Sequence, residues 1–449
     1  MDRALPYGSG EVVVTGLPDV VAELLPAVVG VPAIAPEQLG SVLAEKVQHP
    51  IGAPKLSDFV AGATGVTIVI PDKTRKAGQR ALLGALLEFL TAHGLPREHV
   101  RVLIGLGTHP QHSEFELEHL LGADLLADLR TMGTLAESSG QRTADFVDLG
   151  STSRGTRVKI HRWLLDDGPV IVTGSITYHY YAGYSGGRKG VLPGCAAEES
   201  IRASHQLAFR RAPSGSIERD PGAGAGRLTG NPIYEDQLEA VRMLPRAPFL
   251  INTITNPQDQ IIELVAGDLI AAHDYGSTLV DAYYQASCEY PYDLVVASAG
   301  GFPSDINLIQ SHKALDNAVR ACVPGGTVLL LAECSQSLGN PNALDWAALG
   351  TADAVLQRLG EQYEVIGGTV EGLLRKCEEW DVRLVSALPD HVASRFGFGF
   401  CSTWMGSTVD VSGLIPPGGR VALMPAAGIT MPVRHKGSIQ EQVMRRSPL

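Results

Sequence analysis

Apolar, mostly β-branched runs alternate with a helical pattern along the first half of the chain. The runs are "VTIVI" from Val66, "VRVLIGLG" from Val100 and "PVIVTGS" from Pro169, and the stretch from Ala77 to His93 has the spacing of a helix. Continuous apolar runs are typical of strands buried on both faces, and their alternation with helices is typical of a parallel sheet with crossover helices. This half of the chain therefore predicts one doubly wound α/β unit.

The second half repeats the pattern. Apolar runs begin at Tyr292 ("YDLVVASAGG"), Gly325 ("GGTVLLLAEC") and Val382 ("VRLVSAL"), and a helical stretch runs from about Leu308 to Cys322. The predicted fold class is accordingly α/β, with two doubly wound, Rossmann-like domains.

The boundary between the domains is expected in the helical stretch from Asp268 to Asp281, because a helix links the two sets of strands there. We expect an N-terminal cofactor-binding domain over residues 1–272 and a C-terminal domain over residues 273–449. The last apolar run, "GRVALMPAAG" from Gly419, leaves open that roughly the last 25 residues return to the N-terminal domain.

The charge balance and the cysteines limit the cellular compartment and the kinds of binding partner that we expect for this protein. The formal net charge is −12, and no long Lys/Arg run supplies the basic surface that nucleic acids require. The six cysteines include no C-x-x-C pair, which argues against a zinc site or a disulfide scaffold and favours a reducing cytoplasm. No run of about 18 apolar residues occurs, so no membrane span is predicted. An anionic ligand must then be held by a few local cations.

Polar residues gather where four of the predicted strands end, in the segments Pro71–Arg75, Gly107–His112, Gly174–Lys189 and Gly300–Lys313. Open α/β sheets bind ligands at the carboxyl edge of their strands. A single polar loop of this kind is also explained by turns and helix caps. Because the four segments come from both sheets, we expect the active site in a cleft between the two domains.

The first two segments offer an arginine and a histidine. In "PDKTR", Asp72 and Thr74 suit either a turn or a ligand contact, whereas Arg75 is a permanently charged fork for a carboxylate or phosphate, or else a surface residue at a helix start. In "GTHPQHSEFE", His109 is favoured as an acid/base group. His112 and the glutamates after it fit the first turn of the next helix.

The stretch "YHYYAGYSGGRKGVLPG" from Tyr178 is rich in glycine. Gly186 and Gly187 allow the backbone to approach a phosphate closely, and Lys189 lies in the same loop. The loop is neither a Walker motif nor a dinucleotide fingerprint, because G-x-x-x-x-G-K-[ST] and G-x-G-x-x-G are both absent from it. A flexible lid would have the same composition.

Two further pairs of polar residues are candidates. His179 and His205 flank the glycine-rich loop, although either suits a structural role on composition alone. Gln310 and Lys313 lie three residues apart in "GGFPSDINLIQSHK", so they share one face of a helix whose predicted N-cap is Asp305. An ordinary amphipathic helix with a solvated lysine explains that spacing equally well.

Taken together, these segments resemble the lactate racemase family, whose members hold a nickel pincer nucleotide. The matching pieces are "DKTR" from Asp72, "GTH" from Gly107, "YHYYAGYSGGRKGVLPG" from Tyr178, His205, "GGFPSDINLIQSHK" from Gly300 and "LLLAECSQSLGNP" from Leu329. They follow the order of the family and span most of the chain.

The resemblance implies two cofactors, nickel and pyridinium-3,5-bisthiocarboxylic acid mononucleotide, and enzymes that make this nucleotide as partners. Lys189 corresponds to the lysine that binds the nucleotide through a thioamide, and His205 corresponds to the protein ligand of nickel. His109 and His179 correspond to the proton-transfer histidines. The remaining implied residues are Asp72, Thr74, Gly186 and Gly187 for the cofactor, and Arg75, Lys313, Gln310 and Tyr178 for the substrate.

The implied reaction inverts the C2 centre of a small anionic 2-hydroxy acid by reversible hydride transfer. Loss of the C2 proton is unfavourable, because the carboxylate already carries the charge that a carbanion would add. One histidine instead takes the hydroxyl proton while hydride moves to the pyridinium ring, and return to the other face of the planar 2-keto acid inverts the centre. In this interpretation His109 and His179 lie on opposite sides and serve the two enantiomers.

Lactate or a short aliphatic analogue is the expected substrate, because Tyr180 and Tyr181 suggest a confined pocket with no extra basic group for a second carboxylate. Malate, phenyllactate and sugar acids stay open as alternatives. An NAD-dependent dehydrogenase is disfavoured by the missing fingerprint, and a carrier without catalysis by the presence of both histidines. The tryptophan of a Q-W-Q segment found in several relatives is absent, and Trp404 is another candidate for a pocket aromatic.

Overall fold

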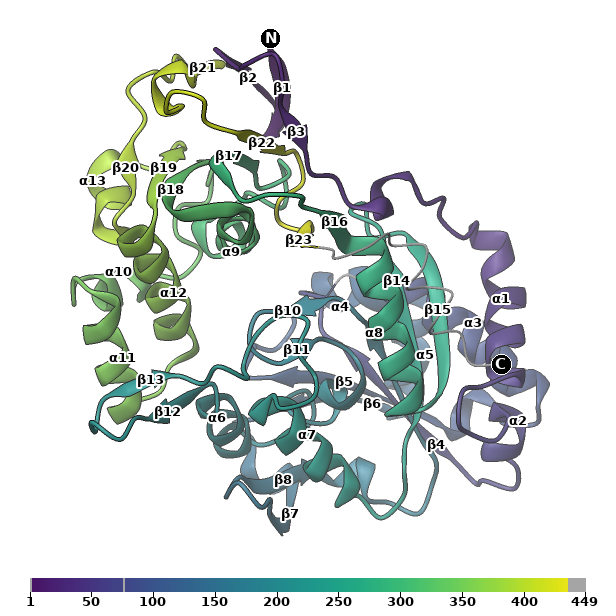
Figure 1. Cartoon of the computed structure of the whole chain (residues 1–449). Helices are drawn as coiled ribbons and strands as arrows, with labels where there is room; N and C mark the ends of the chain where they lie inside the picture. Colours follow the sequence, from purple (N-terminus) through teal and green to yellow (C-terminus); the bar gives the residue numbers. More distant parts are fainter. Residues whose placement is uncertain (1, 76, 435–449) are drawn as a thin grey trace. The chain divides into compact units, whose positions relative to one another are not determined.

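The computed structural model describes residues 2–75 and 77–434, which belong to two compact units (Figure 1). The first unit comprises residues 30–210 and 219–281. The second unit comprises the chain up to Val29, residues 211–218, and the chain from Ala282 onward. Among the described residues, no helix is both long and apolar enough to cross a membrane.

A six-stranded sheet forms the centre of the first unit, in the order β6-β5-β4-β9-β14-β15. The strands are β4 (Val66–Pro71), β5 (Val100–Gly107), β6 (Leu135–Ser139), β9 (Val170–Ser175), β14 (Phe249–Thr255) and β15 (Ile261–Asp268). All neighbours are parallel except β14 and β15. This is the doubly wound order, in which the chain starts at the centre, winds to one edge and then returns to the other side. The predicted fold class is confirmed, and the winding reverses between β4 and β9.

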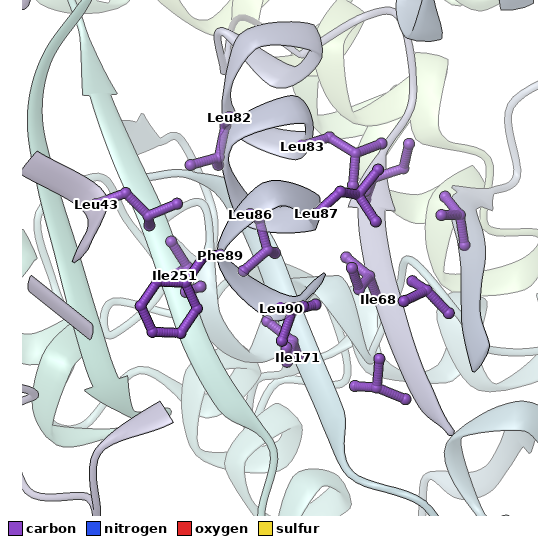
Figure 2. Close-up of a cluster of buried hydrophobic side chains, with 14 of the residues drawn as sticks. Leu43, Ile68, Leu82, Leu83, Leu86, Leu87, Phe89, Leu90, Ile171 and Ile251 are labelled. Atoms are coloured by element: carbon purple, nitrogen blue, oxygen red, sulfur yellow. The ribbon is translucent and has the colours of Figure 1, made fainter. Parts of the chain in front are cut away.

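Helices cover both faces of this sheet because alternate strand residues point to opposite sides. One face packs α1 (Pro36–Gln48), α2 (Leu56–Phe59), α3 (Gln79–Ala92), α4 (Glu114–Leu121) and α5 (Ala123–Thr131) against a core that includes Ile68. Figure 2 shows Leu82, Leu86 and Leu90 of α3 in this core. The other face packs α6 (Glu198–Gln206), α7 (Pro232–Arg242) and α8 (Ala271–Tyr284) against Val69 and its neighbours. Each fully buried leucine contributes roughly 2 kcal/mol to folding.

The second unit is built on a parallel six-stranded sheet, in the order β20-β19-β18-β17-β22-β3. The strands are β3 (Ala22–Glu23), β17 (Tyr292–Ser298), β18 (Cys322–Leu331), β19 (Asp381–Val385), β20 (Gly399–Phe400) and β22 (Val421–Met424). The helices are α9 (Leu308–Ala321), α10 (Ala343–Ala347), α11 (Ala352–Glu361), α12 (Val365–Glu379) and α13 (Asp390–Ala393). A small sheet of β1 (Arg3–Tyr7), β2 (Gly10–Thr15) and β21 (Thr408–Asp410) shares a core with β17 and β18.

Short strand pairs complete the structure. They are β7 (Phe146–Ser151) with β8 (Arg157–His161), β10 (Tyr178–His179) with β11 (Gly183–Tyr184), β12 (Phe209–Arg211) with β13 (Ile217–Arg219), and β16 (Gln285–Ser287) with β23 (Met431–Val433). The β10–β11 pair directly follows β9 and carries His179, which places a predicted site residue at the carboxyl edge of the first sheet.

The start of the chain differs from the domain division expected over residues 1–272. It belongs to the second unit, because β3 pairs with β22 and β2 pairs with β21. The first unit ends at Asp281, so α8 is mostly part of it. The late strands β22 and β23 also lie in the second unit. The expectation that the last residues return to the first domain is therefore not met by residues 421–433, and residues 435–449 lie outside the described residues.

Candidate active site

Three of the four polar segments meet the first sheet at the carboxyl ends of neighbouring strands. Pro71–Arg75 follows β4, Gly107–His112 follows β5, and Gly174–Lys189 follows β9. Since β4 and β9 are the two strands between which the winding reverses, the segments surround the point where doubly wound sheets bind ligands. The fourth segment, Gly300–Lys313, follows β17 in the second unit. The prediction of a cleft between the domains stays a prediction.

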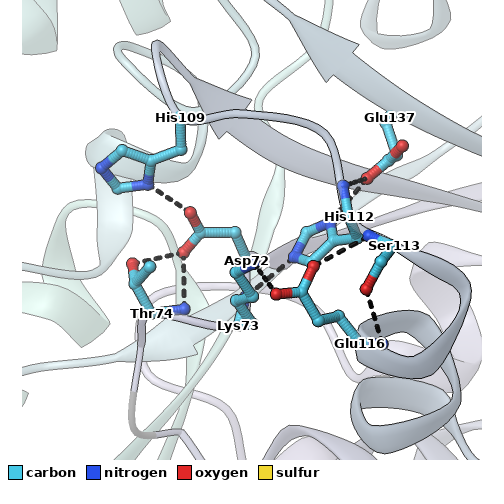
Figure 3. Close-up of polar contacts among 8 residues, drawn as sticks. All are labelled: Asp72, Lys73, Thr74, His109, His112, Ser113, Glu116 and Glu137. Carbon is cyan, nitrogen blue, oxygen red and sulfur yellow. Dashed lines mark hydrogen bonds and ion pairs between the residues drawn. The ribbon is translucent and has the colours of Figure 1, made fainter.

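His109 is held by a carboxylate. Its Nδ1 forms a short contact with Oδ2 of Asp72, while Oδ1 of Asp72 accepts hydrogen bonds from the Thr74 hydroxyl (2.6 Å) and the Thr74 backbone N–H (3.1 Å) (Figure 3). Burial alone would raise the pKa of the Asp72 carboxyl, but the bonds from His109 and Thr74 and the charge of Arg75 bring it below its usual value. Asp72 is thus an ionised acceptor. The His109 side chain is 40% exposed, so its other nitrogen is open to a ligand.

His112 has a different role from the one predicted. It precedes Ser113, the N-cap of α4, and so lies outside the helix. Its side chain is 1% exposed, with Nδ1 2.5 Å from Oε1 of Glu137 and Nε2 accepting the Lys73 backbone N–H at 3.2 Å (Figure 3). Glu116 fulfils the expectation of a first-turn carboxylate and completes a capping box with Ser113. His112 therefore fastens the loop that carries His109.

The β10–β11 hairpin positions His179. The backbone N–H groups of Tyr181 and Ala182 both donate to Nδ1 of His179, at 3.3 and 3.1 Å. The ring of Tyr180 stacks on the imidazole with centroids 4.9 Å apart. The site prediction based on two pocket tyrosines is only half supported, since Tyr181 is 2% exposed and packs in a separate core cluster.

Two tyrosine hydroxyls fix this hairpin to α8. Tyr178 and Tyr184 both donate to Oδ1 of Asp281, at 2.7 and 2.6 Å. The hydroxyl of Tyr178 is engaged with a carboxylate of the same unit, and the expected contact of Tyr178 with substrate stays a prediction. The hairpin is therefore anchored at both of its strands, which limits the movement of His179.

The glycine-rich loop requires glycine at two of the predicted positions. Gly186 and Gly187 have φ values of +73° and +54°, in the left-handed region. A Cβ at Gly186 would lie 2.4 Å from Oδ1 of Asn252, and one at Gly187 would lie 2.6 Å from the ring of His273. The same Asn252 oxygen accepts the Gly187 N–H at 2.8 Å. The loop is hence a rigid structure and not the flexible lid that its composition also allowed.

Lys189 and Arg188 are buried in this loop, and no carboxylate within residues 2–75 and 77–434 pairs with the lysine. The Arg188 side chain donates to the carbonyl oxygens of Ala182 (2.5 Å) and Tyr184 (3.0 Å), and its guanidinium lies 4.4 Å from the ring centre of Tyr234. Burial lowers the pKa of Arg188 to about 10, so it stays charged at neutral pH. Burial and the charges of Arg75 and Arg188 hold the pKa of Lys189 well below its usual value. Lys189 is consequently suited to act as a neutral amine.

His205 lies in the last turn of α6 with one ring nitrogen engaged. Its Nδ1 is 2.8 Å from the carbonyl oxygen of Ile201, which can only accept, so Nδ1 carries the proton and Nε2 has a free lone pair. Burial and the charges of Lys189 and Arg75 lower the pKa of His205 to about 4, although the bond to Ile201 acts against this shift. A neutral imidazole with a free Nε2 is the form that binds transition metals.

The electrostatic couplings bring together four of the predicted residues. The charges of Lys189, Arg75 and His205 all depress the pKa of His179, after burial as the largest cause. Arg75 itself is exposed, and its charge also acts on Asp72 and Lys189. In the first unit, the acid/base candidate His179, the cofactor lysine Lys189 and the metal-ligand candidate His205 thus all lie within the electrostatic influence of Arg75.

The second unit supplies the remaining candidates. Lys313 donates to Oε1 of Gln310 at 3.0 Å on the exposed face of α9, so their predicted common helical face is present. The predicted N-cap was wrong, because Asn307 caps this helix by accepting the N–H of Gln310 at 2.9 Å. Asp305 is fully buried and accepts the N–H of Gly8 at 2.7 Å instead.

No cluster of three or more His, Cys, Asp or Glu side chains that could bind a metal ion occurs among residues 2–75 and 77–434. All six cysteines are free thiols. Trp404 packs 6.1 Å from Tyr7 and lines a depression of the second unit with Phe398 and Phe400.

Sequence analysis missed several residues that support the site. Asn252 and Glu137 are polar residues on strands β14 and β6, and His273 and Asp281 lie on α8. An asparagine inside the otherwise apolar run "FLINTIT" was a usable signal for Asn252, because a buried amide needs partners. The other three gave no local signal, since each acts on a segment at least 25 residues away in the sequence.

Comparison with known proteins agrees with this geometry. A model of the lactate racemase N-terminal domain matches residues 7–216, and one of the lactate racemase C-terminal domain matches residues 288–357. The chain is 28% identical over 305 residues to a lactate racemase from Thermoanaerobacterium thermosaccharolyticum, and the aligned region covers 68% of each chain. It is 29% identical over 288 residues to a lactate racemase from Lactiplantibacillus plantarum, and this aligned region covers 64% of each chain.

The fold is matched over almost the full length. The structure of the lactate racemase apoprotein from T. thermosaccharolyticum superposes with a TM-score of 0.84 at 22% identity, covering 97% of this chain and 100% of that one. The matched domains and relatives define an enzyme of the isomerase class, a racemase. The chain belongs to the lactate racemase family.

Proposed function

We propose that this protein is a nickel-pincer-dependent racemase of a small 2-hydroxy acid, with lactate or a short aliphatic analogue as substrate. The observation that carries the proposal is the gathering of His109, His179, Lys189 and His205 in one unit, at the edge of the sheet where ligands bind. Two relatives that are named lactate racemases support the choice of substrate.

The residues of the first unit fit the nucleotide cofactor. The Lys189 amine is buried and its pKa is held well below the usual value, and a thioamide forms when a lysine nitrogen lone pair joins a thio-acid carbon with loss of water. The rigid backbone at Gly186 and Gly187 is suited to the phosphate. When bound, the cofactor supplies an acceptor for hydride.

His205 is the residue that would hold nickel. Its Nε2 carries a lone pair and its Nδ1 is oriented by the Ile201 carbonyl, which is the usual arrangement for a histidine ligand. Because the described residues offer no cluster of three or more metal ligands, the other donor atoms would come from the sulfur and carbon atoms of the cofactor.

The substrate is held by cations and handled by histidine. Arg75 is exposed, its charge acts on His179 and His205, and it suits the substrate carboxylate. His109, fixed by Asp72, takes the hydroxyl proton through its open nitrogen. Tyr180, stacked on His179, is the aromatic side chain that we expect beside the substrate.

The test is to produce the chain together with the cofactor-making enzymes and to measure its intact mass and nickel content. We expect a nickel-bearing adduct that is lost in Lys189→Ala. The loaded protein is then given single enantiomers of lactate, malate and phenyllactate, and chiral chromatography follows inversion. An unmodified, metal-free chain from cells that load the L. plantarum relative would contradict the proposal.

A further inference from the structure

The amine of Lys189 has no partner of its own that orients it. The side chain is buried, and among residues 2–75 and 77–434 its Nζ forms no hydrogen bond and no ion pair. The backbone of Lys189 is bonded at both ends, because its N–H donates to the Gly186 carbonyl at 3.1 Å and its carbonyl accepts the Gly194 N–H at 2.9 Å. Whatever holds this backbone turn in place therefore also places the amine.

Asn252 joins the turn to the first sheet. It is a fully buried residue of β14, and its Oδ1 accepts the N–H of Gly187, two residues before Lys189, at 2.8 Å. Its Nδ2 donates to the Ile251 carbonyl at 3.0 Å. Only one orientation of the amide satisfies both bonds, because a rotated amide would put its NH₂ against the Gly187 N–H and its oxygen against a carbonyl oxygen. The oxygen that faces the turn is thus fixed.

Two glycines make room for this asparagine. Gly174 of β9 pairs with Asn252 in the strand register, and a Cβ at Gly174 would lie 3.4 Å from Nδ2. A Cβ at Gly186 would lie 2.4 Å from Oδ1. A shift of the turn away from β14 would leave a buried N–H and a buried acceptor without partners, which is unfavourable. The close packing and the hydrogen bond therefore fix the same position of the turn.

Helix α8 limits the turn sterically. A Cβ at Gly187 would lie 2.6 Å from the ring of His273, whose Nε2 is 2.9 Å from the Ser185 carbonyl oxygen. The ring of His273 forms no hydrogen bond to Gly187 itself, whereas Asn252 does. Asn252 is accordingly the side chain whose loss changes the bonding of the turn and leaves the packing of α8 intact.

We propose that Asn252 is a positioning residue for the covalent attachment of the cofactor at Lys189. The inference rests on the proposed function, in which the Lys189 nitrogen bonds to a thio-acid carbon. In that step the C–N bond forms and the C–O bond of the thio acid breaks, and the oxygen leaves as water with one proton from the amine and one from the thio acid. A displacement of the amine by about 1 Å slows such a step roughly 100-fold.

The test compares two variants of Asn252 in the full-length, unloaded protein. Asn252→Ala loses the bond to Gly187, whereas Asn252→Asp keeps an oxygen in that place and loses the bond to the Ile251 carbonyl. Each protein is mixed with the nickel-pincer nucleotide from the cofactor-making enzymes, and intact mass follows the formation of the adduct. In parallel, cyanate labels Lys189 without nucleotide, and mass spectrometry of the Lys189 peptide gives that rate.

The two rates separate the position of the amine from its reactivity. Cyanate reacts with a neutral amine that it reaches, whereas attachment of the nucleotide also requires the correct position. We expect Asn252→Ala to lose about 100-fold in attachment and less than about threefold in labelling. Asn252→Asp should keep its ratio of attachment to labelling within about tenfold of the wild-type ratio. Division by the labelling rate removes the effect of a new charge on the amine.

Asn317→Ala is the matched control. Asn317 is a buried asparagine of the second unit, and its Nδ2 donates to the Ala427 carbonyl at 2.8 Å. This variant should lower thermal stability and leave both rates unchanged. If attachment and labelling fall together in Asn252→Ala, Asn252 only supports the fold and the inference fails. If Asn252→Ala does not fold, Asn252→Asp decides, because a loss of about 100-fold in its ratio contradicts the inference.

Failure of the proposed function gives a different pattern. If the wild-type protein gains no adduct, or if the adduct survives in Lys189→Ala, the proposed attachment is wrong and the role of Asn252 is wrong with it. If the wild-type protein is loaded through Lys189 and Asn252→Ala is loaded equally fast, the proposed function stands and only the role of Asn252 is wrong.

Discussion

Two lysines are buried to the same degree, one in each unit, in opposite surroundings. Lys189 is 9% exposed and Lys376 is 8% exposed. Lys376 lies 2.7 Å from Oδ1 of Asp316 and donates to the Gly372 carbonyl at 3.0 Å. Within residues 2–75 and 77–434, the Lys189 amine has neither an ion pair nor a hydrogen bond, and Arg188 adds a second positive charge beside it.

The difference separates a structural lysine from a reactive one. Although burial raises the pKa of Asp316, the charges of Lys376 and Arg320 hold it far below its usual value, so Asp316 is ionised at neutral pH. A compensated charge of this kind stabilises the packing of α9 and α12. An uncompensated lysine instead gives up its proton and becomes a nucleophile.

The largest effects are expected from the matched variants Lys189→Met and Lys376→Met. Lys189→Met should lose cofactor attachment completely with unchanged or higher stability, because an uncompensated polar group is removed. Lys376→Met should load normally but lose roughly 3 kcal/mol of stability, because Asp316 is left buried without its partner. Intact mass and urea unfolding measure the two properties. A Lys189→Met variant that is destabilised and still carries the adduct would show that Lys189 is a structural lysine and not the attachment site.

Asp72→Asn should have the next largest effect, since it removes the one carboxylate that compensates a histidine of the site. Thr74 would hold the amide oxygen, so the amide NH₂ would face Nδ1 of His109 and impose the wrong tautomer. We expect roughly a 1000-fold loss in kcat with nickel content unchanged. Thr74→Val, which removes one bond to Asp72, is the control and should lose less than about tenfold. Equal losses would mean that Asp72 only shapes the turn.

A smaller effect is expected from Arg188→Met, which removes the charge beside Lys189. The Lys189 pKa should rise, so its modification by an amine reagent at pH 7 in the unloaded protein should slow roughly tenfold. Arg188→Lys keeps a charge and should label like the wild-type protein. Mass spectrometry of the Lys189 peptide gives the rate, and identical rates in all three proteins would assign the low pKa to burial and the charge of Arg75.

The smallest effect concerns buried histidines that, like Lys189, are kept neutral. Burial lowers the pKa of both His161 in the first unit and His312 in the second to about 4. In the unfolded chain each of these histidines takes up a proton near pH 6.5, whereas in the folded chain it does so only near pH 4. Each histidine therefore contributes to stability above pH 6.5, and this contribution is lost as the pH falls toward 4. The loss is roughly 2 kcal/mol by pH 4.5.

The matched measurement is urea unfolding at pH 7 and pH 4.5 of His161→Gln and His312→Gln. Each variant should lose less stability than the wild-type protein over this interval. Unchanged pH dependence in both variants would show that other groups cause the acid sensitivity.

The strands of the first unit and the places of the polar loops that follow them were predictable because their signals are local. The run from Val66 and the run from Val100 became β4 and β5, and the polar residues after them met at one edge because parallel strands place their carboxyl ends together. The helix over Leu308–Ala321 was placed correctly, but its cap was assigned to Asp305, whose partners Gly8 and Glu333 are remote in the sequence.

The protonation of the site could not be predicted, because it depends on long-range partners. The sequence places His109 and His179 in equivalent loops, and only the folded chain brings Asp72 to one ring and two backbone N–H groups to the other. The place of Tyr181 could not be predicted for a similar reason, since its ring packs against Phe209 in the core, and the confined pocket stays a prediction.

The pairing of β3 with β22 sets the order in which the chain can fold during synthesis. Ala22 pairs with Ala422, so one of the first strands made waits for about 400 residues to be added, roughly 20 to 80 s on the ribosome. The first sheet, from Val66 to Asp268, has by then emerged entire and can close. The chain therefore finishes the unit that carries Lys189 while β3 is still unpaired, and the second unit is completed last.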